Sequence, residues 1–255
     1  MLELLGLTTT SAVLAIVVTI AAGIVKGTIG FALPLIMISG LSIIMEPKLA
    51  LAAIVLPALL TNLHQTFRNG IRAALEAATE HWRFMLATCL VLTLTAQSVA
   101  IIPTHVLYLV IGVPVVTLAV IQLIGFRMTI SPQHRVRAEW IIGSITGIFG
   151  GISATWGPTT VLYLLAINSP KSRQIIVQGT VYGIGSIAYL LAHLQSGIFN
   201  LENVFLSAFL ILPALIGMAI GMRLQQKLDA NRFRTVTLIV LVLLGFNLIR
   251  RGLFV

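Results

Sequence analysis

Lys26 is the charged residue whose position most suggests a binding role, because it lies within an apolar stretch that runs from Ser11 to Met45. A lysine at depth in a membrane needs an anion or an acidic partner. We place no Asp or Glu within an expected membrane span, so a bound anion is the simplest partner. If the chain around Lys26 instead reaches the cytoplasmic surface, its side chain is one more positive charge that extends into water. The sequence leaves both interpretations open.

Two glycine-rich stretches, KGTIG at residues 26–30 and GGISATWG at residues 150–157, each precede a short apolar segment. The first N–H groups of a helix have no partner within it, and the helix dipole adds partial positive charge there. A helix that begins inside a membrane therefore attracts anions at its start. We expect one start near residues 30–32 and another near residues 153–155, with glycines that let a ligand approach the backbone. The alternative is that the glycines serve close helix packing.

Polar side chains and one tryptophan lie close to these two stretches in the sequence. Trp156 is a candidate wall of the site, although a tryptophan near a segment end is often an interface anchor. Asn62 and Gln178 lie on the segments that follow the two turns, and interhelical hydrogen bonds are their alternative role. The candidate substrate-binding residues are Lys26, Gly27, Gly30, Phe31, Gly151, Ser153, Thr155, Trp156, Asn62 and Gln178.

Catalytic patterns are absent from the sequence, which contains no Ser/His/Asp arrangement, no HExxH motif and no P-loop. The single cysteine, Cys89, allows no disulfide framework and has no metal-ligand spacing around it. We therefore expect that the protein is not an enzyme, that it has no ATP motor, and that it binds no metal or cofactor.

The composition places these residues in an integral membrane protein. The 255 residues are 58% hydrophobic and only 9% charged, and the mean hydropathy is +1.05. Soluble domains carry about 25% charged residues. The net charge of +9 is concentrated in short loops, so membrane topology explains it better than nucleic acid does. We expect an all-α protein whose partners are the lipid bilayer and a small anion. The sequence does not predict the oligomeric state.

Hydropathy and helix-breaking residues divide the chain into ten apolar segments. These are residues 9–25, 31–45, 49–67, 83–102, 105–126, 139–149, 153–168, 174–194, 203–222 and 235–249. The first two, and likewise the sixth and seventh, fall short of the roughly 20 residues that a spanning helix needs. We expect about 8 to 10 transmembrane segments, with each glycine-rich turn joining a pair of short helices.

The two short pairs resemble each other in sequence, which predicts an internal duplication. Gly23, Gly27 and Pro34 recur 124 residues later as Gly147, Gly151 and Pro158. We expect a first repeat at residues 1–126, a cytoplasmic linker at 127–138 and a second repeat at 139–255.

Arginine and lysine mark the cytoplasmic loops. They cluster in residues 68–83, 127–137 and 223–234, whereas Pro103–Thr104 and residues 196–203 carry none and are expected outside. Counting crossings from these loops gives the two repeats opposite orientations, and Arg250 and Arg251 then lie outside, against the rule. Inverted repeats with paired, interrupted short segments are typical of secondary transporters.

The stretches GIVKGTIGFALP and GIFGGISATWGP resemble the paired motifs of the TauE/SafE family, also called the sulfite exporter or TSUP family, over nearly the whole chain. The resemblance implies a bacterial inner-membrane transporter of small sulfur-containing anions such as sulfite or sulfonates. Lys26 and Phe31 depart from the denser glycine run of many members, which favours a more strongly anionic or a bulkier ligand.

These observations together predict a secondary transporter of small anions that works by alternating access, driven by an ion gradient or by the substrate's own gradient. Two other functions fit the same sequence. One is a passive channel for anions or water, which would conduct without saturation. The other is a membrane assembly subunit that transports nothing.

Overall fold

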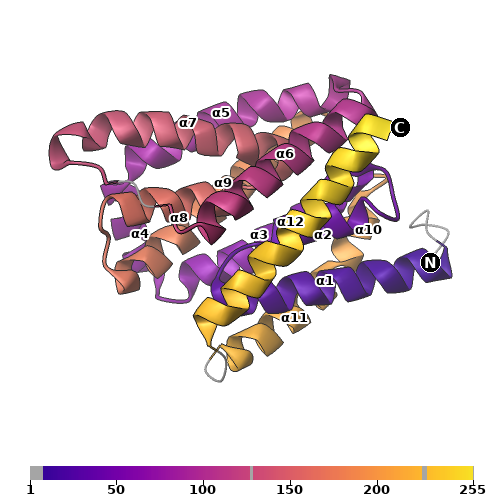
Figure 1. Cartoon of the computed structure of the whole chain (residues 1–255), viewed down its shortest axis with the longest axis horizontal. Helices are drawn as coiled ribbons and strands as arrows, with labels where there is room; N and C mark the ends of the chain where they lie inside the picture. The colour runs from indigo at the N-terminus through magenta and orange to yellow at the C-terminus, as the bar shows by residue number, and fades with distance from the viewer. Residues whose placement is uncertain (1–7, 127–128, 226–228, 255) are drawn as a thin grey trace.

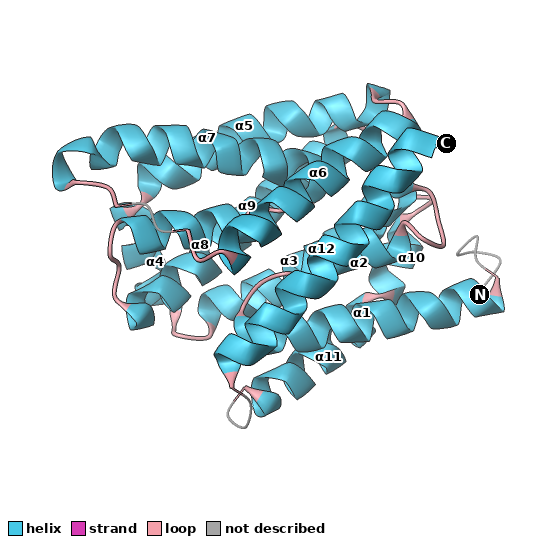
Figure 2. Ribbon diagram, in the orientation of Figure 1, coloured by secondary structure: helices cyan, strands magenta, loops and turns pink. Residues whose placement is uncertain are grey.

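The computed structural model describes residues 8–126, 129–225 and 229–254. Arg127 and Lys227, which we assigned to cytoplasmic loops, lie outside these residues. The described chain is all-helical, without a strand (Figure 2). Seven of its helices are long and apolar enough to cross a membrane. The prediction of an all-α, multi-pass membrane protein is confirmed.

The elements are α1 (Thr9–Ile29), α2 (Leu33–Leu41), α3 (Pro47–Phe67), α4 (Ile71–Glu80), α5 (Trp82–Ile101), α6 (Thr104–Leu123), the 3-10 helix η2 (Pro132–His134), α7 (Arg135–Ser153), α8 (Gly157–Ala166), α9 (Lys171–Gln195), α10 (Val204–Phe209), α11 (Ile211–Leu224) and α12 (Ala230–Phe254).

Only the second helix of each expected short pair is short. α1 has 21 residues and continues through Lys26 and Gly27, where we expected a turn, and α7 has 19 residues rather than the 11 of the expected segment 139–149. The short helices are α2, with 9 residues, and α8, with 10. The prediction of a turn at KGTIG was therefore wrong. In a membrane the helix is the cheapest way to satisfy the backbone, so glycine alone does not end it.

The chain reverses direction after α1 and after α7, over residues 30–32 and 154–156. Left-handed backbone occurs in both crossings, at Gly30 and Ala32 in the first and at Ala154 in the second. A proline, Pro34 or Pro158, is the second residue of the helix that follows, where its missing N–H costs no helical hydrogen bond. We call residues 30–32 the first crossover and residues 154–156 the second crossover.

Glycines bring α1 against α11 and α7 against α5 (Figure 1). Gly23 of α1 lies against Gly217 of α11, and Gly27 lies one turn further along against Gly221. On α7, Gly143, Gly147 and Gly151 lie in the same way against the backbone of α5. In each pair the residue numbers of the contacting positions rise in the same direction along both helices, so the two helices are parallel. The packing alternative for Gly27 and Gly151 therefore has direct support.

The remaining long helices lie between and across these two pairs. α3 packs against α9 in the middle of the molecule, and the Thr66 hydroxyl donates to the Gly179 carbonyl at 2.7 Å where the two helices cross. α12 packs against α6 across one face in Figure 1. The first and second crossovers are enclosed by these helices, so both lie in the protein interior.

The helix ends that carry the basic loops meet at one end of the molecule. α4, which we did not predict, supplies Glu80 to an ion pair with Arg173 of α9 at 2.7 Å and to another with Arg135 of α7 at 3.5 Å. His81 lies beside them, with Nδ1 2.9 Å from the Tyr163 hydroxyl. These contacts join α4, α7, α8 and α9 at the end where we expected the cytoplasm.

Glu139 is an acidic residue in a position where we expected none. It lies in α7, is only 2% exposed, and accepts hydrogen bonds from the Tyr163 hydroxyl at 3.0 Å and from Arg135 Nε at 3.1 Å. The statement that no acidic residue lies within a span was wrong here. The arginine one turn earlier explains why the carboxylate is tolerated, since a buried charge needs a paired and hydrogen-bonded partner.

Close packing at the glycines predicts that Gly221→Ala destabilises the protein. The added methyl group would overlap the Ile24 carbonyl oxygen, and overpacking of this kind costs about 1 to 3 kcal/mol. Gly185→Ala is the matched control, because its new methyl would lie 3.8 Å from the nearest atom, in the Trp156 ring. Thermal unfolding in detergent should show a lower melting temperature for the first variant only. Equal melting temperatures would contradict this account of the α1–α11 contact.

The Glu80 cluster predicts a loss of stability on mild acidification. Burial lowers the pKa of His81, and the nearby charges of Arg135 and Arg173 act in the same direction, against Glu80 and Glu139. A folded-state pKa below the ordinary 6.5 means that stability is fully present above about pH 6.5 and is lost as the pH falls below it. The pKa of Glu80 is also lowered. Burial raises it, but the Arg173 hydrogen bond and the charges of His81 and Arg173 together outweigh burial.

The measurement is the melting temperature between about pH 8 and about pH 5, a window that lies above the ordinary carboxylate range. We expect the wild-type melting temperature to fall toward the acidic end and the His81→Gln variant to show a shallower fall. A variant that loses stability as steeply as the wild type would assign the pH dependence to another group.

Candidate functional site

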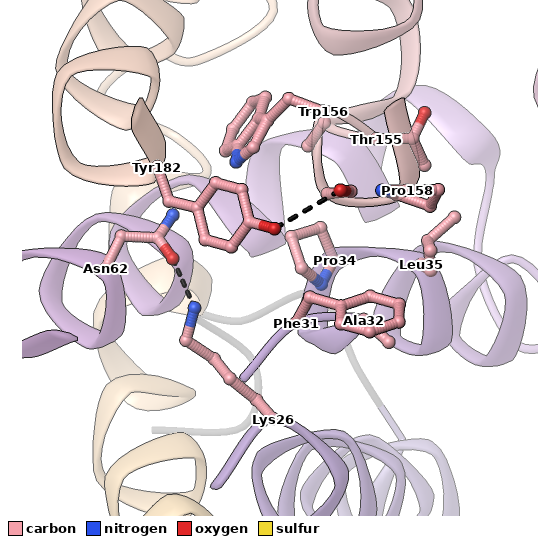
Figure 3. Close-up of a pocket in the computed structure, with 12 residues that line it drawn as sticks. Lys26, Phe31, Ala32, Pro34, Leu35, Asn62, Thr155, Trp156, Pro158 and Tyr182 are labelled. Carbon is pink, nitrogen blue, oxygen red and sulfur yellow. Dashed lines mark hydrogen bonds between the residues drawn. The ribbon is translucent and has the colours of Figure 1, made fainter. Parts of the chain in front are cut away.

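The first and second crossovers meet in the middle of the protein and enclose a small cavity (Figure 3). Its volume is about 10 Å³, which is room for about one water molecule. The first crossover lies against the start of α8, since a methyl group on Gly157 would lie 3.2 Å from Phe31 Cβ. The lining residues are Lys26, Phe31, Ala32, Pro34, Leu35, Asn62, Ala154, Thr155, Trp156, Gly157, Pro158 and Tyr182.

Lys26 is buried beside this cavity, in the last turn of α1. Its side chain is directed toward α3, where the ammonium group donates a hydrogen bond to the Asn62 Oδ1 atom (Figure 3). Its Nζ atom also lies 5.7 Å from the centre of the Tyr182 ring, within the range of a cation–π contact. Lys26 is 3% exposed, so the interpretation of Lys26 as a surface charge is wrong.

No acidic residue among the described residues forms an ion pair with Lys26. Asn62 lies six residues before Arg68, which places it about 9 Å along the helix from that end of α3. An ammonium group at this depth with one neutral partner and an aromatic face has unused capacity for an anion, because lysine has three donors.

Buried polar atoms near Lys26 lack partners among the described residues. They are the Asn62 Nδ2 donor and the Gln65 Oε1 acceptor, both on α3. The Gln65 amide nitrogen and the Gln178 Oε1 atom both lie near Gly30, each close enough to contact a side chain at that position. Buried polar atoms in native structures are generally satisfied. Orphaned atoms around a buried cation therefore mark a place where a polar ligand would complete the hydrogen bonding.

The starts of α2 and α8 add backbone donors at the same place. The first amide of α2 that donates a helical hydrogen bond is that of Ile36, which bonds to the Ala32 carbonyl at 3.0 Å. The amides of Leu33 and Leu35 come before it and have no helical acceptor. In α8, Thr160 N bonds to the Trp156 carbonyl at 3.1 Å, which leaves the amides of Gly157 and Thr159 ahead of it. The expected helix starts near residues 30–32 and 153–155 thus lie within two residues of the observed ones.

A larger cavity of about 220 Å³ leads from Lys26 toward the end of the molecule that carries the basic loops. It lies between α1, α3, α9 and α11, and Arg68 and Gln225 are at the same end. The lining residues are Lys26, Gly27, Ile29, Gly30, Gln65, Arg68, Asn69, Ile175, Gln178, Met218, Met222 and Gln225. Lys26 borders both cavities.

Eight of the ten candidate residues line one of these two cavities. Lys26, Phe31, Asn62, Thr155 and Trp156 border the small cavity, and Gly27, Gly30 and Gln178 border the large one. Trp156 is 2% exposed and its ring meets the Tyr189 ring edge-on at 5.7 Å, so it is a wall residue and not an interface anchor.

Gly151 and Ser153 line neither cavity. Gly151 packs against α5, where a methyl group would overlap the Leu92 carbonyl oxygen. The Ser153 hydroxyl donates to the Phe149 carbonyl at 2.9 Å and contacts the Thr155 hydroxyl, which itself donates to Phe149 at 3.1 Å. Both hydroxyls thus complete the C-terminal end of α7 within their own turn.

Residues that our sequence analysis did not select also line the large cavity. Met218 and Met222 lie within α11, and Gln225 lies just after it. This helix is remote in sequence from both glycine-rich stretches. The pairing of Gly217 and Gly221 with α1 brings this helix to the site. The spacing of small residues four apart was the available signal, since it is typical of close helix contacts in membranes.

The difference between the two cavities predicts different accessibility to a thiol reagent. In a Cys89→Ser background, Ile175→Cys should react quickly with a water-soluble maleimide, because Ile175 lines the large cavity and is 46% exposed. Thr155→Cys should react at least about tenfold more slowly, because Thr155 is 1% exposed and borders only the small cavity. Labelling rates in detergent test this, and equal rates would contradict the closed state of the crossovers.

Comparison with known families agrees with this arrangement. Residues 15–248 match the family described as Sulfite exporter TauE/SafE, and the chain belongs to that family. No curated protein and no solved structure matches the chain.

Proposed function

We propose that this member of the TauE/SafE sulfite exporter family is a secondary transporter of small anions, with its substrate site at the first and second crossovers. The observation that carries the proposal is the convergence of two helix starts and the buried Lys26 on one cavity. Helix starts and a buried ammonium group each favour negative charge. The orphaned Asn62 and Gln65 atoms supply a donor and an acceptor for an oxygen-rich ligand.

The substrate class follows from the family and from the donors. The family description names sulfite, and a sulfite or sulfonate group presents several oxygen acceptors to an ammonium group and backbone amides. We propose sulfite or a small sulfonate as the substrate and the bacterial inner membrane as the location. The two proposed repeats, at residues 1–126 and 139–255, would contribute one crossover each.

The cavities support a carrier over a channel. The path from the basic end is open as far as Lys26, whereas the space between the crossovers holds about one water molecule. A site that is open to one side and closed at its centre is what alternating access requires. Inverted repeats would allow the opposite opening with the same contacts exchanged between the two halves.

Transport into proteoliposomes tests this proposal. We expect uptake of radiolabelled sulfite or a small sulfonate that saturates with concentration, and a reduction of about tenfold or more in Lys26→Ala, because charged hydrogen bonds are the strong ones. Arg72→Ala is the control, since that side chain is 94% exposed on α4.

The outcomes separate the alternatives. Uptake that rises linearly without saturation would indicate a channel. The absence of uptake or exchange for a panel of sulfite, sulfonates and carboxylates would contradict transport of these anions. Wild-type rates in Lys26→Ala would remove Lys26 from the site.

A further inference from the structure

A third cavity, at the basic end of the molecule, is lined by two basic residues and by no acidic residue. It has a volume of about 200 Å³ and lies between the end of α1, the first crossover, α8, α9, α12 and the residue after α11. Its charged lining residues are Lys171 at the start of α9 and Arg234 near the start of α12. Its other polar lining residues are Thr28, Gln174, Gln178 and Gln225.

Among the described residues, neither Lys171 nor Arg234 forms an ion pair with an acidic side chain. Arg234 donates from Nη2 to the Gln122 Oε1 atom at 2.8 Å, while its Nε atom is buried without a hydrogen-bond partner. A guanidinium group held by a neutral amide, with a buried free donor, has capacity for a further acceptor.

This cavity adjoins the path to Lys26. It shares Ile29, Ile175, Gln178 and Gln225 with the cavity that Lys26 borders. An anion that moves from the Lys26 cavity into this one passes the shared side chains of Gln178 and Gln225 before it meets Lys171 and Arg234. Two separate positive sites therefore lie in adjoining cavities.

We propose that Lys171 and Arg234 form a second anion-binding site, which holds the transported oxyanion at the mouth of the pathway. The inference rests on the proposed function of the Lys26 site. The ligand class is a small oxyanion with at least two acceptor oxygens, because a guanidinium group pairs with such groups through two parallel hydrogen bonds. The phosphate of an anionic lipid has the same chemistry. The continuity with the Lys26 cavity favours the soluble anion.

The test measures equilibrium binding of radiolabelled sulfite to purified protein in nanodiscs made of neutral lipid. Lys26→Ala removes the inner site, and we expect this variant to retain sulfite binding while losing transport. Adding Lys171→Gln or Arg234→Gln to it should raise the remaining dissociation constant about tenfold or more. Arg232→Gln is the matched control. It removes the same charge two residues before Arg234, and the Arg232 side chain is 90% exposed.

Lys171→Gln should leave the fold intact, because the Lys171 side chain makes no hydrogen bond within the described residues. Arg234→Gln, in contrast, loses the hydrogen bond to Gln122. Nanodiscs that contain phosphatidylglycerol distinguish the two sources of the ligand. Sulfite binding that is unchanged by this lipid supports the soluble anion, and sulfite displacement by the lipid assigns the site to a headgroup and overturns the proposal.

Two results separate this inference from the proposed function. The first result applies if the wild type transports sulfite. If Lys26→Ala then retains no sulfite binding, or if adding Lys171→Gln or Arg234→Gln leaves that binding unchanged, the second site is wrong and the transporter proposal stands. If the wild type neither binds nor transports sulfite, both proposals fail for that anion.

Discussion

The first N–H groups of a helix have no partner within it, and the structure is organised around two helix starts that are buried in the protein. Each unsatisfied group in hydrocarbon costs several kcal/mol, so such starts are tolerated only where protein or a cavity surrounds them. α2 and α8 begin directly after the first and second crossovers, and Phe31 of the first crossover lies against Gly157 at the start of α8. The surrounding helices seal them from lipid. This enclosure allows a short helix to begin in the protein interior, where its dipole favours negative charge.

Lys26 intensifies the same electrostatic environment. Burial of an ammonium group is costly unless it is paired, and here its hydrogen-bond partner is the neutral Asn62 with the Tyr182 ring nearby. Neutral partners satisfy hydrogen bonding without cancelling the charge. The cavity between the crossovers therefore keeps a net positive field from the lysine and from two helix dipoles. An acidic partner in place of Asn62 would instead neutralise the charge of the ammonium group.

The sequence predicted the class of fold and the approximate location of the helix starts, because hydropathy and the glycine-rich stretches at 26–30 and 150–157 are local signals. It misplaced the end of α1, because Gly27 was interpreted as a turn residue although it packs on α11. That contact joins residues nearly 200 positions apart, and a sequence without its fold does not reveal it. The burial of Glu139 was missed for a related reason. Its partners, Arg135 and Tyr163, lie on different helices, and only the fold brings the second of them close.

The glycine contacts also determine which parts of the protein can move as units. α1 belongs to the first half of the chain and packs on α11 of the second half, while α7 of the second half packs on α5 of the first. Close-packed helices of this kind shift as bodies, because their interfaces do not deform continuously. Each body carries one crossover, since α1 leads into residues 30–32 and α7 into residues 154–156. An alternating-access cycle that preserves these contacts would thus move α1 with α11 against α5 with α7. The moving units would then mix the two sequence halves, and the crossover contact beside Lys26 would be the interface that opens.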